Sequence, residues 1–130
     1  MDKNNFYAKF STKNNCLDVL ERVFWQGKPY CPYCKSTNYT DLKGEKRYHC
    51  NSCNTSFSVT VGSAFHKTKV DLNKWFYAIY INTNKKEYLS ARQLGYEIDV
   101  TKDTALYMLK RIKRFNKECE DLINYINEIQ

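Results

Sequence analysis

Apolar positions along this chain recur first at helical spacing, then in short alternating runs, and then at helical spacing again. Within residues 13–25 they fall on one face of a helix, and Gly27 and Pro29 end the pattern. The following segment, residues 30–61, carries short β-type runs bounded by turn residues. We therefore expect a small α+β protein in which an N-terminal helix leads into a sheet.

Three short antiparallel strands are expected inside this β segment. They are residues 39–41, 46–49 and 57–61, and apolar side chains alternate with hydroxyl side chains in the last of them. Residues 42–45 contain a glycine and supply the hairpin turn between the first two strands.

The remainder of the chain has helical patterns. A buried helix is expected over residues 72–81, with Asp71 as its N-cap, because apolar side chains surround that segment. A polar loop over residues 82–87 separates it from the next helix. That helix opens with the capping box S-A-R-Q at residues 90–93 and runs to about residue 98.

Residues 90–114 fit a helix-turn-helix. Gly95 is expected where the two helices approach closely, and Asp99 occupies the turn position that often requires a left-handed backbone. Thr101 caps the second helix, whose outer face presents long hydrogen-bond donors and an aromatic ring, as a major-groove helix does. The candidate DNA-contacting residues are Lys102, Asp103, Tyr107, Lys110, Arg111 and Arg114. The alternative is a generic helical hairpin with a solvated basic face.

A row of apolar residues continues this pattern, so that one long C-terminal helix, or two abutting ones, covers residues 102–128. Its members are Met108, Ile112, Phe115, Cys119, Leu122, Ile126 and Ile129. We expect all of them except Cys119 to form a homodimer interface that places two recognition helices on one duplex. We call this row of seven apolar residues the seam. In the alternative, the seam folds back within the chain onto Phe6, Tyr7 and Phe10.

The spacing of four cysteines predicts a metal site. Cys31 and Cys34 form one C-x2-C pair, and Cys50 and Cys53 form a second pair after fifteen intervening residues. Each pair supplies two sulfur ligands from one tight turn, which suits a single tetrahedral Zn²⁺. Four thiolates close the coordination sphere, so this zinc is structural. The alternatives are four buried reduced cysteines, a redox dithiol, and His49 in place of Cys50 as a ligand.

Composition narrows the class of protein. The 130 residues suffice for one domain or for two very small ones. We divide them into an N-terminal helix with the zinc ribbon (1–66), a helix-turn-helix region (67–115) and a C-terminal helical tail (116–130). A net charge of +7 suits a polyanion binder, although the last segment is acidic. No apolar run is long enough to cross a bilayer, and no signal peptide is visible. We expect a cytoplasmic, nucleoid-associated protein with reduced thiols, in which Cys16 and Cys119 lie in the core.

Several stretches together resemble the N-terminal part of bacterial insertion-sequence transposases, which carry a zinc ribbon, a helix-turn-helix and then a DDE nuclease domain. The stretches are residues 25–34, 48–53, 57–69, 74–80 and 109–112, with Cys16 and Leu20. The resemblance implies that the ribbon and the helix-turn-helix bind transposon ends. Gly95 and Asp99 depart from the alanine and glycine that are common in that family.

We therefore expect a zinc-stabilised, transposase-derived protein that binds double-stranded DNA as a regulator or accessory factor, and not an enzyme. The family's catalytic carboxylates lie beyond the helix-turn-helix, and two-metal chemistry needs carboxylates that converge from separate elements. The acidic residues of the last segment are expected on one helix, so they cannot converge in this way; they are Glu118, Glu120, Asp121 and Glu128. The alternatives are a protein-interaction module that binds a host or phage factor through its tyrosines, and a truncated transposase remnant.

Overall fold

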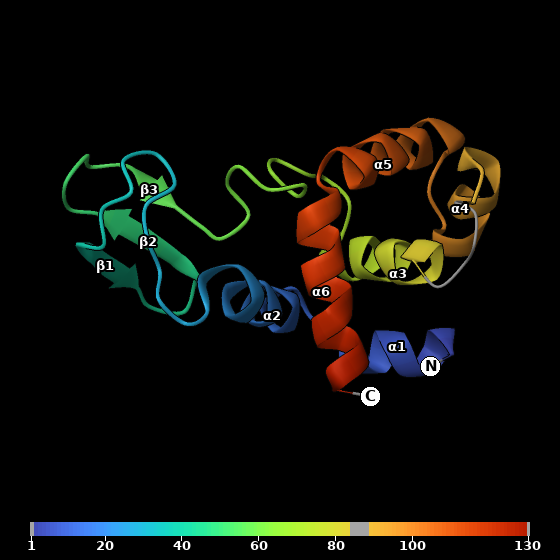
Figure 1. Ribbon diagram of the computed structural model, residues 1–130, viewed down its shortest axis with the longest axis horizontal. Coiled ribbons are helices and arrows are strands. Elements are labelled where there is room, and N and C mark those ends of the chain that lie inside the picture. Colours follow the sequence, from blue (N-terminus) through green and yellow to red (C-terminus); the bar gives the residue numbers. More distant parts are fainter. Residues whose placement is uncertain (1, 84–88, 130) are drawn as a thin grey trace.

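The computed structural model describes residues 2–83 and 89–129 and shows a small sheet joined to a helical body (Figure 1). The elements in chain order are α1 (Lys3–Lys9), α2 (Lys13–Trp25), β1 (Tyr39–Leu42), β2 (Arg47–Cys50), β3 (Ser56–Phe57), α3 (Leu72–Thr83), α4 (Ala91–Ile98), α5 (Lys102–Arg114) and α6 (Asn116–Glu128). The sheet lies at one end of the long axis, and α2 lies between it and α3 to α6. The expected α+β class is confirmed.

The sheet has the order β1-β2-β3, and both strand pairs are antiparallel. Tyr48 of β2 lies opposite Phe57 of β3. The expected third strand, residues 57–61, is shorter than predicted. A turn in which the backbone N–H of Val61 donates to the Ser58 carbonyl, at 3.2 Å, takes the chain away from the sheet.

Helix α1 has no counterpart among the expected elements. The Asp2 side chain caps it by accepting from the backbone N–H of Asn5 at 2.8 Å. Its two fully buried aromatic residues, Phe6 and Phe10, pack against rings of α3, with Phe10 5.5 Å from Phe76 between centroids. One core residue in so short a helix and one at its C-cap form no periodic pattern, so α1 could not be predicted from the sequence.

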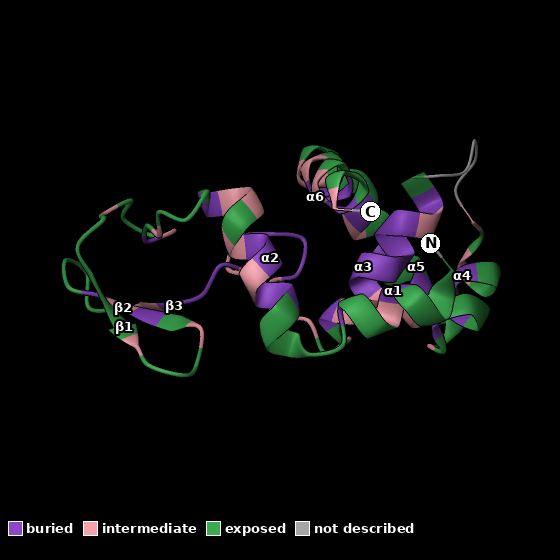
Figure 2. Ribbon diagram, turned by 90° about the horizontal axis from the view of Figure 1, so that it is seen from below, coloured by how far each residue is buried: buried purple, intermediate pink, exposed green. Residues whose placement is uncertain are grey.

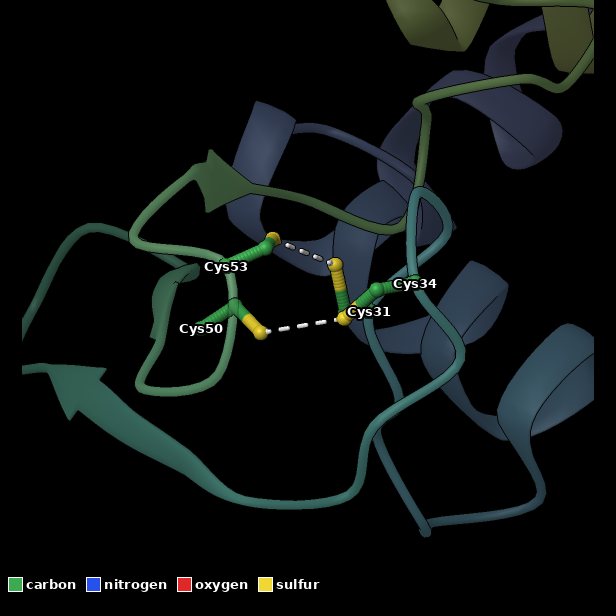
Figure 3. A group of neighbouring side chains, drawn as sticks. All are labelled: Cys31, Cys34, Cys50 and Cys53. Atoms are coloured by element: carbon green, nitrogen blue, oxygen red, sulfur yellow. Dashed lines mark hydrogen bonds between the residues drawn. The ribbon is translucent and has the colours of Figure 1, made fainter.

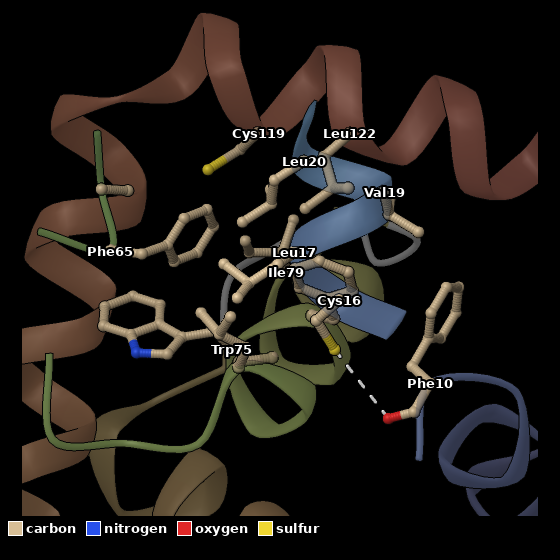
Figure 4. Packing of buried hydrophobic residues seen from close by; sticks show 14 of the residues in the cluster. Phe10, Cys16, Leu17, Val19, Leu20, Phe65, Trp75, Ile79, Cys119 and Leu122 are labelled. Carbon is tan, nitrogen blue, oxygen red and sulfur yellow. Dashed lines mark hydrogen bonds between the residues drawn. The ribbon is translucent and has the colours of Figure 1, made fainter. Parts of the chain in front are cut away.

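Helix α3 is the centre of the hydrophobic core. It is buried on nearly all sides, as the apolar pattern around it predicted, and Figure 2 shows this burial against the exposed outer faces of its neighbours. Leu20 of α2 and Leu122 of α6 meet Trp75 and Ile79 there (Figure 4). The core also contains Cys16 and Cys119, as expected, and burial raises the pKa of each thiol to about 12. Of the expected loop over residues 82–87, the first two residues belong to α3, and the others lie outside the described residues.

The C-terminal region consists of two abutting helices, not one long helix. The backbone of Phe115, at φ −104° and ψ 40°, ends α5 and begins α6, and Figure 1 shows the two helices running in different directions. The apolar seam is therefore divided between two packing surfaces. The α5 part packs with α4, whereas the α6 part packs with α2 and α3.

The seam is buried inside a single chain, which corrects the expected homodimer interface. Met108, Ile112, Leu122 and Ile126 are at most 2% exposed, and Phe115 and Ile129 pack partly buried against the same core. Buried side chains are not available to a second chain. The seam folds back within the chain, as in the alternative, but its α6 part packs mainly on α2 and α3 and not on Phe6, Tyr7 and Phe10, which contact α3.

Candidate zinc ribbon and nucleic-acid interface

The four cysteines of the C-x2-C pairs converge at the end of the sheet (Figure 3). All four sulfur atoms lie within 4.8 Å of one another, with Cys31 Sγ 3.7 Å from Cys53 Sγ and Cys34 Sγ 3.5 Å from Cys50 Sγ. A tetrahedral Zn²⁺ with Zn–S bonds of about 2.3 Å places its sulfur ligands roughly 3.8 Å apart. The observed separations match that arrangement.

The two cysteine pairs have the same backbone geometry. In the first, the N–H of Lys35 donates to the Cys31 carbonyl at 2.8 Å; in the second, the N–H of Asn54 donates to the Cys50 carbonyl at 2.9 Å. Lys35 and Asn54 both adopt left-handed backbone angles, with φ of 65° and 60°. Both turns thus present their two sulfurs from matching positions, which is why the pairs face each other across the site.

Crowding of the thiols explains why this site requires a cation. A hydrogen bond from Thr55 lowers the pKa of Cys53 to about 6. At Cys34 the backbone N–H of Ser36 lowers the pKa, but the hydrogen bond with Cys50 and desolvation outweigh it and raise the pKa to about 12. Full deprotonation of four neighbouring thiols needs a compensating positive charge, which a divalent metal supplies.

The four cysteines are the ligand set of one structural zinc ion. Their number closes a tetrahedral sphere and leaves no position for an activated water molecule. His49, the alternative ligand, lies in β2 outside the group of four converging sulfurs. His66 is engaged elsewhere, because its Nδ1 accepts the backbone N–H of Gly62 at 2.7 Å.

The two cysteine turns and β1 to β3 together form the zinc ribbon. An aromatic cluster attaches this ribbon to α2. The Trp25 ring centroid lies 5.6 Å from that of Tyr48 and 5.9 Å from that of Phe57. The Tyr48 hydroxyl donates to Glu21 Oε2 at 2.8 Å, and burial together with this carboxylate raises the pKa of Tyr48. The ribbon is therefore positioned by α2 rather than by the sheet alone.

The α4–α5 unit has the local geometry expected of a helix-turn-helix. Ser90 and Gln93 form the reciprocal capping box, and Thr101 caps α5 by accepting from the N–H of Thr104 at 3.1 Å. Asp99 has the left-handed conformation, with φ 58° and ψ 57°. A Cβ on Gly95 would lie 2.8 Å from the Val100 carbonyl oxygen, so this glycine permits the close approach of α4 to the turn.

The outer face of α5 carries the predicted DNA-contacting residues. Lys102, Asp103, Lys110 and Arg114 are exposed, and Tyr107 is 43% exposed with its ring 6.3 Å from that of Trp75. The opposite stripe, Ala105, Met108 and Ile112, is buried. Five of the six candidate residues therefore share one accessible face, and their contact with DNA stays a prediction.

Arg111, the sixth candidate, is directed into the protein. Its Nε donates to the Ala64 carbonyl at 2.8 Å and its Nη2 to the Ser63 carbonyl at 3.0 Å, and its guanidinium lies over the Phe115 ring. Because these bonds occupy the guanidinium, we leave Arg111 out of the proposed DNA surface. Sequence periodicity could not indicate this, since the carbonyls lie about fifty residues away in the chain.

Two further residues belong to the exposed face of α5, and sequence reasoning omitted them. Leu106 is 42% exposed, and Lys113, the penultimate residue of α5, is exposed. The helical period was sufficient to find both. Leu106 follows Lys102 by four positions and Lys113 follows Lys110 by three, so each lies on the same outer face. An exposed leucine among cations suits contact with a thymine methyl group.

Among the described residues, no helix combines the length and apolar character that a membrane span requires.

Comparison with known proteins identifies the relatives of this architecture. Residues 11–56, which comprise all of α2 and the ribbon up to the first residue of β3, match the family described as transposase zinc-ribbon domain. A protein of Halobacterium salinarum, described as an uncharacterized protein in transposable element ISH50, is 32% identical over 109 residues. The match covers 82% of this chain and 35% of that protein, so the chain spans about a third of the relative's length. No solved structure matches the chain. The resemblance to the N-terminal region of insertion-sequence transposases is thereby confirmed, and the chain is a transposase-related protein whose residues 11–56 match the transposase zinc-ribbon family model.

Proposed function

We propose that this chain binds double-stranded DNA, with α5 as the recognition helix in the major groove and the zinc ribbon as a second DNA-facing module. The observation that carries the proposal is the two-sided character of α5. Its inner stripe is anchored in the core, while its outer face exposes four cationic side chains and one acidic side chain. The exposed cations are Lys102, Lys110, Lys113 and Arg114.

Position along α5 divides its residues by role. Lys102 and Tyr107 lie nearer the N-terminus, the end that reaches base edges when such a helix enters the major groove. Lys110 and Arg114 lie nearer the C-terminal end, where contacts go to phosphates and carry no sequence information. The first pair therefore determines sequence preference, and the second pair supports affinity.

The proposed role is regulatory or accessory, without catalysis by this chain. Glu118, Glu120 and Asp121 lie on α6, and Glu118 accepts the backbone N–H of Ala64 at 3.2 Å. Within residues 2–83 and 89–129, the group suited to a metal ion is the cysteine cluster. Nuclease and strand-transfer assays with Mg²⁺ or Mn²⁺ should stay at background. Cleavage that a single carboxylate substitution abolishes would refute this part of the proposal.

DNA recognition is tested on duplexes selected from a random library and on scrambled versions of them, by fluorescence anisotropy. Lys110→Ala and Arg114→Ala should weaken binding to both duplexes alike. Lys102→Ala and Tyr107→Ala should change the preference between them, since a good base contact provides about 1–3 kcal/mol of discrimination. Lys117→Ala on α6 is the control for loss of one exposed charge. Equal binding by all variants would place the site elsewhere.

A protein partner is the second candidate, and the observation that favours it is Tyr96. This residue of α4 is 90% exposed, which is unusual for a large aromatic ring. Salt dependence separates the two functions. DNA binding weakens steeply as salt rises, because the protein releases counterions from the phosphates, whereas an interface built on tyrosine rings depends little on salt.

A further inference from the structure

A groove of about 740 Å³ lies between the ribbon and the helical body. The first turns of α2 and α3 line it from the body, β2 and the start of β3 line it from the ribbon, and the connecting segment 58–71 lines it between them. In Figure 1 this connecting segment is the yellow-green loop between β3 and α3. The groove exists because α2 holds the ribbon at a distance from α3 to α6.

The lining of this groove is strongly cationic. Five basic side chains face two acidic ones, Glu45 and Asp71. The amino ends of two helices of 13 and 12 residues also converge on it, and each adds partial positive charge. The basic residues are Lys13, Lys46, Arg47, Lys67 and Lys69.

Two of these five cations have a partner among the described residues, and for the other three none is found there. Lys46 pairs with Asp18, and the Arg47 guanidinium donates to Ser56 Oγ at 3.1 Å. For Lys13, Lys67 and Lys69, no side-chain ion pair or hydrogen bond is found among the residues that the structure describes. Free ammonium groups next to helix amino ends are suited to bind phosphate.

The groove adjoins the exposed face of α5 through Trp75. The Trp75 indole Nε1 donates to Thr68 Oγ1 at 2.8 Å, and Thr68 lines the groove. The same indole lies against the ring of Tyr107 on α5, with 6.3 Å between centroids. Trp75 is fully buried, so this indole holds Thr68 of the groove and Tyr107 of α5 close to each other, and one extended ligand can reach both.

We propose that this groove binds the sugar-phosphate backbone of the duplex whose major groove takes α5. The inference rests on the proposed function and adds a second, sequence-independent contact to it. Its lining provides ammonium groups, which contact phosphates, and one well exposed ring, Tyr33, where a single strand would need several rings on which to stack its bases. The groove is thus a phosphate clamp on duplex DNA.

The test is the salt dependence of binding to a mixed-sequence duplex, measured for the full-length zinc-loaded chain. The groove variant is Lys13→Gln with Lys67→Gln and Lys69→Gln, where glutamine removes the charge but keeps most of the side chain and its polar end. Each phosphate contact contributes about −0.9 to the slope of log K against log salt, so the slope should become shallower by roughly 2 to 3. Preference between selected and scrambled duplexes should not change.

The matched control removes three exposed lysines of α1 and α6, which neither line the groove nor belong to the ribbon: Lys3→Gln with Lys9→Gln and Lys117→Gln. It has the same net charge as the groove variant, and its slope should change by less than about 1. Equal slopes for the two triple variants overturn the groove while leaving DNA binding by α5 intact. Absence of duplex binding by the unmodified chain refutes the proposed function itself. If the groove variant loses binding to single-stranded DNA while its duplex binding is unchanged, the assignment of the groove to duplex DNA is also overturned.

Discussion

Arg111 and Ala64 join α5 to the segment that connects the ribbon to the body: Arg111 Nε donates to the Ala64 carbonyl at 2.8 Å. The N–H of the same alanine donates to Glu118 Oε2 at 3.2 Å, so one peptide segment is held from both α5 and α6. This arrangement fixes the orientation of α5 relative to the groove.

Loss of this link should destabilise the protein. Hydrogen bonds to charged groups contribute about 1.5–3 kcal/mol, so Arg111→Ala should lower the free energy of unfolding by roughly 2 kcal/mol or more, measured by urea titration. Lys113→Ala removes an exposed cation of the same helix and should change stability by no more than about 0.5 kcal/mol. Similar values for both variants would show that the guanidinium does not hold the connecting segment.

Zinc should be bound at one ion per chain, and its removal should unfold the ribbon. The sheet has few buried residues of its own, so the energy of metal binding supplies most of its stability. Cys31→Ser and Cys50→Ser should lose the metal and the amide-exchange protection of residues 30–57, as read by elemental analysis and hydrogen exchange. Cys119→Ala, in the core of the helical body, should retain one zinc. A folded ribbon without metal would contradict this account.

A methyl group at Gly95 should destabilise the helix-turn-helix, although alanine is the better helix former. The added Cβ would lie 2.8 Å from the Val100 carbonyl, a backbone atom that cannot rotate away. Overpacking of this kind typically costs 1–3 kcal/mol, which exceeds the roughly 1 kcal/mol gained in helix propensity. Gly95→Ala should lower the melting temperature, and the control Tyr96→Ala, at a 90% exposed position, should leave it nearly unchanged. A more stable Gly95→Ala variant would show that the turn relaxes freely.

Glu118 should give stability a specific pH dependence. Burial raises its pKa above the ordinary 4.5, and the Ala64 N–H and Arg111 offset this effect only in part. The native state therefore binds the proton more tightly than the unfolded state, and the stability from this group is present below pH 4.5 and lost as the pH rises through the folded pKa. Relative to Glu118→Gln, the unmodified chain should gain stability on acidification from neutral pH. The zinc site is common to both proteins, so its titration cancels, and a difference of opposite slope would contradict the prediction.

The apolar seam of α6 should stabilise the single chain and not an assembly. Leu122 is 0% exposed, so Leu122→Ala should cost about 2–5 kcal/mol and lower the unfolding midpoint of the unassociated chain. Asn124→Ala, on the exposed face of the same helix, should be nearly neutral. A stably folded Leu122→Ala protein that differs from the unmodified chain only in oligomeric state, by light scattering, would restore the dimer seam.

The sequence alone determined the features that depend on near neighbours in the chain. The spacing of the cysteines predicted the metal site, and the capping box at Ser90 and Gln93 predicted the start of α4 to the residue. The left-handed turn at Asp99 was likewise predicted. These features are local because a cap, a turn or a cysteine pair involves residues only a few positions apart.

The tertiary structure decided the features that depend on which surfaces meet. Helical periodicity identified the apolar face of residues 102–128 but not its partner, so it could not distinguish a dimer seam from two helices packed on different parts of one core. The same reason applies to Arg111, whose position on α5 was readable but whose acceptors, Ser63 and Ala64, come from a distant segment. The basic groove also depends on tertiary packing. Its basic residues come from α2, the β1–β2 turn, β2 and the connecting segment, and only the packing of the ribbon against α2 brings them together.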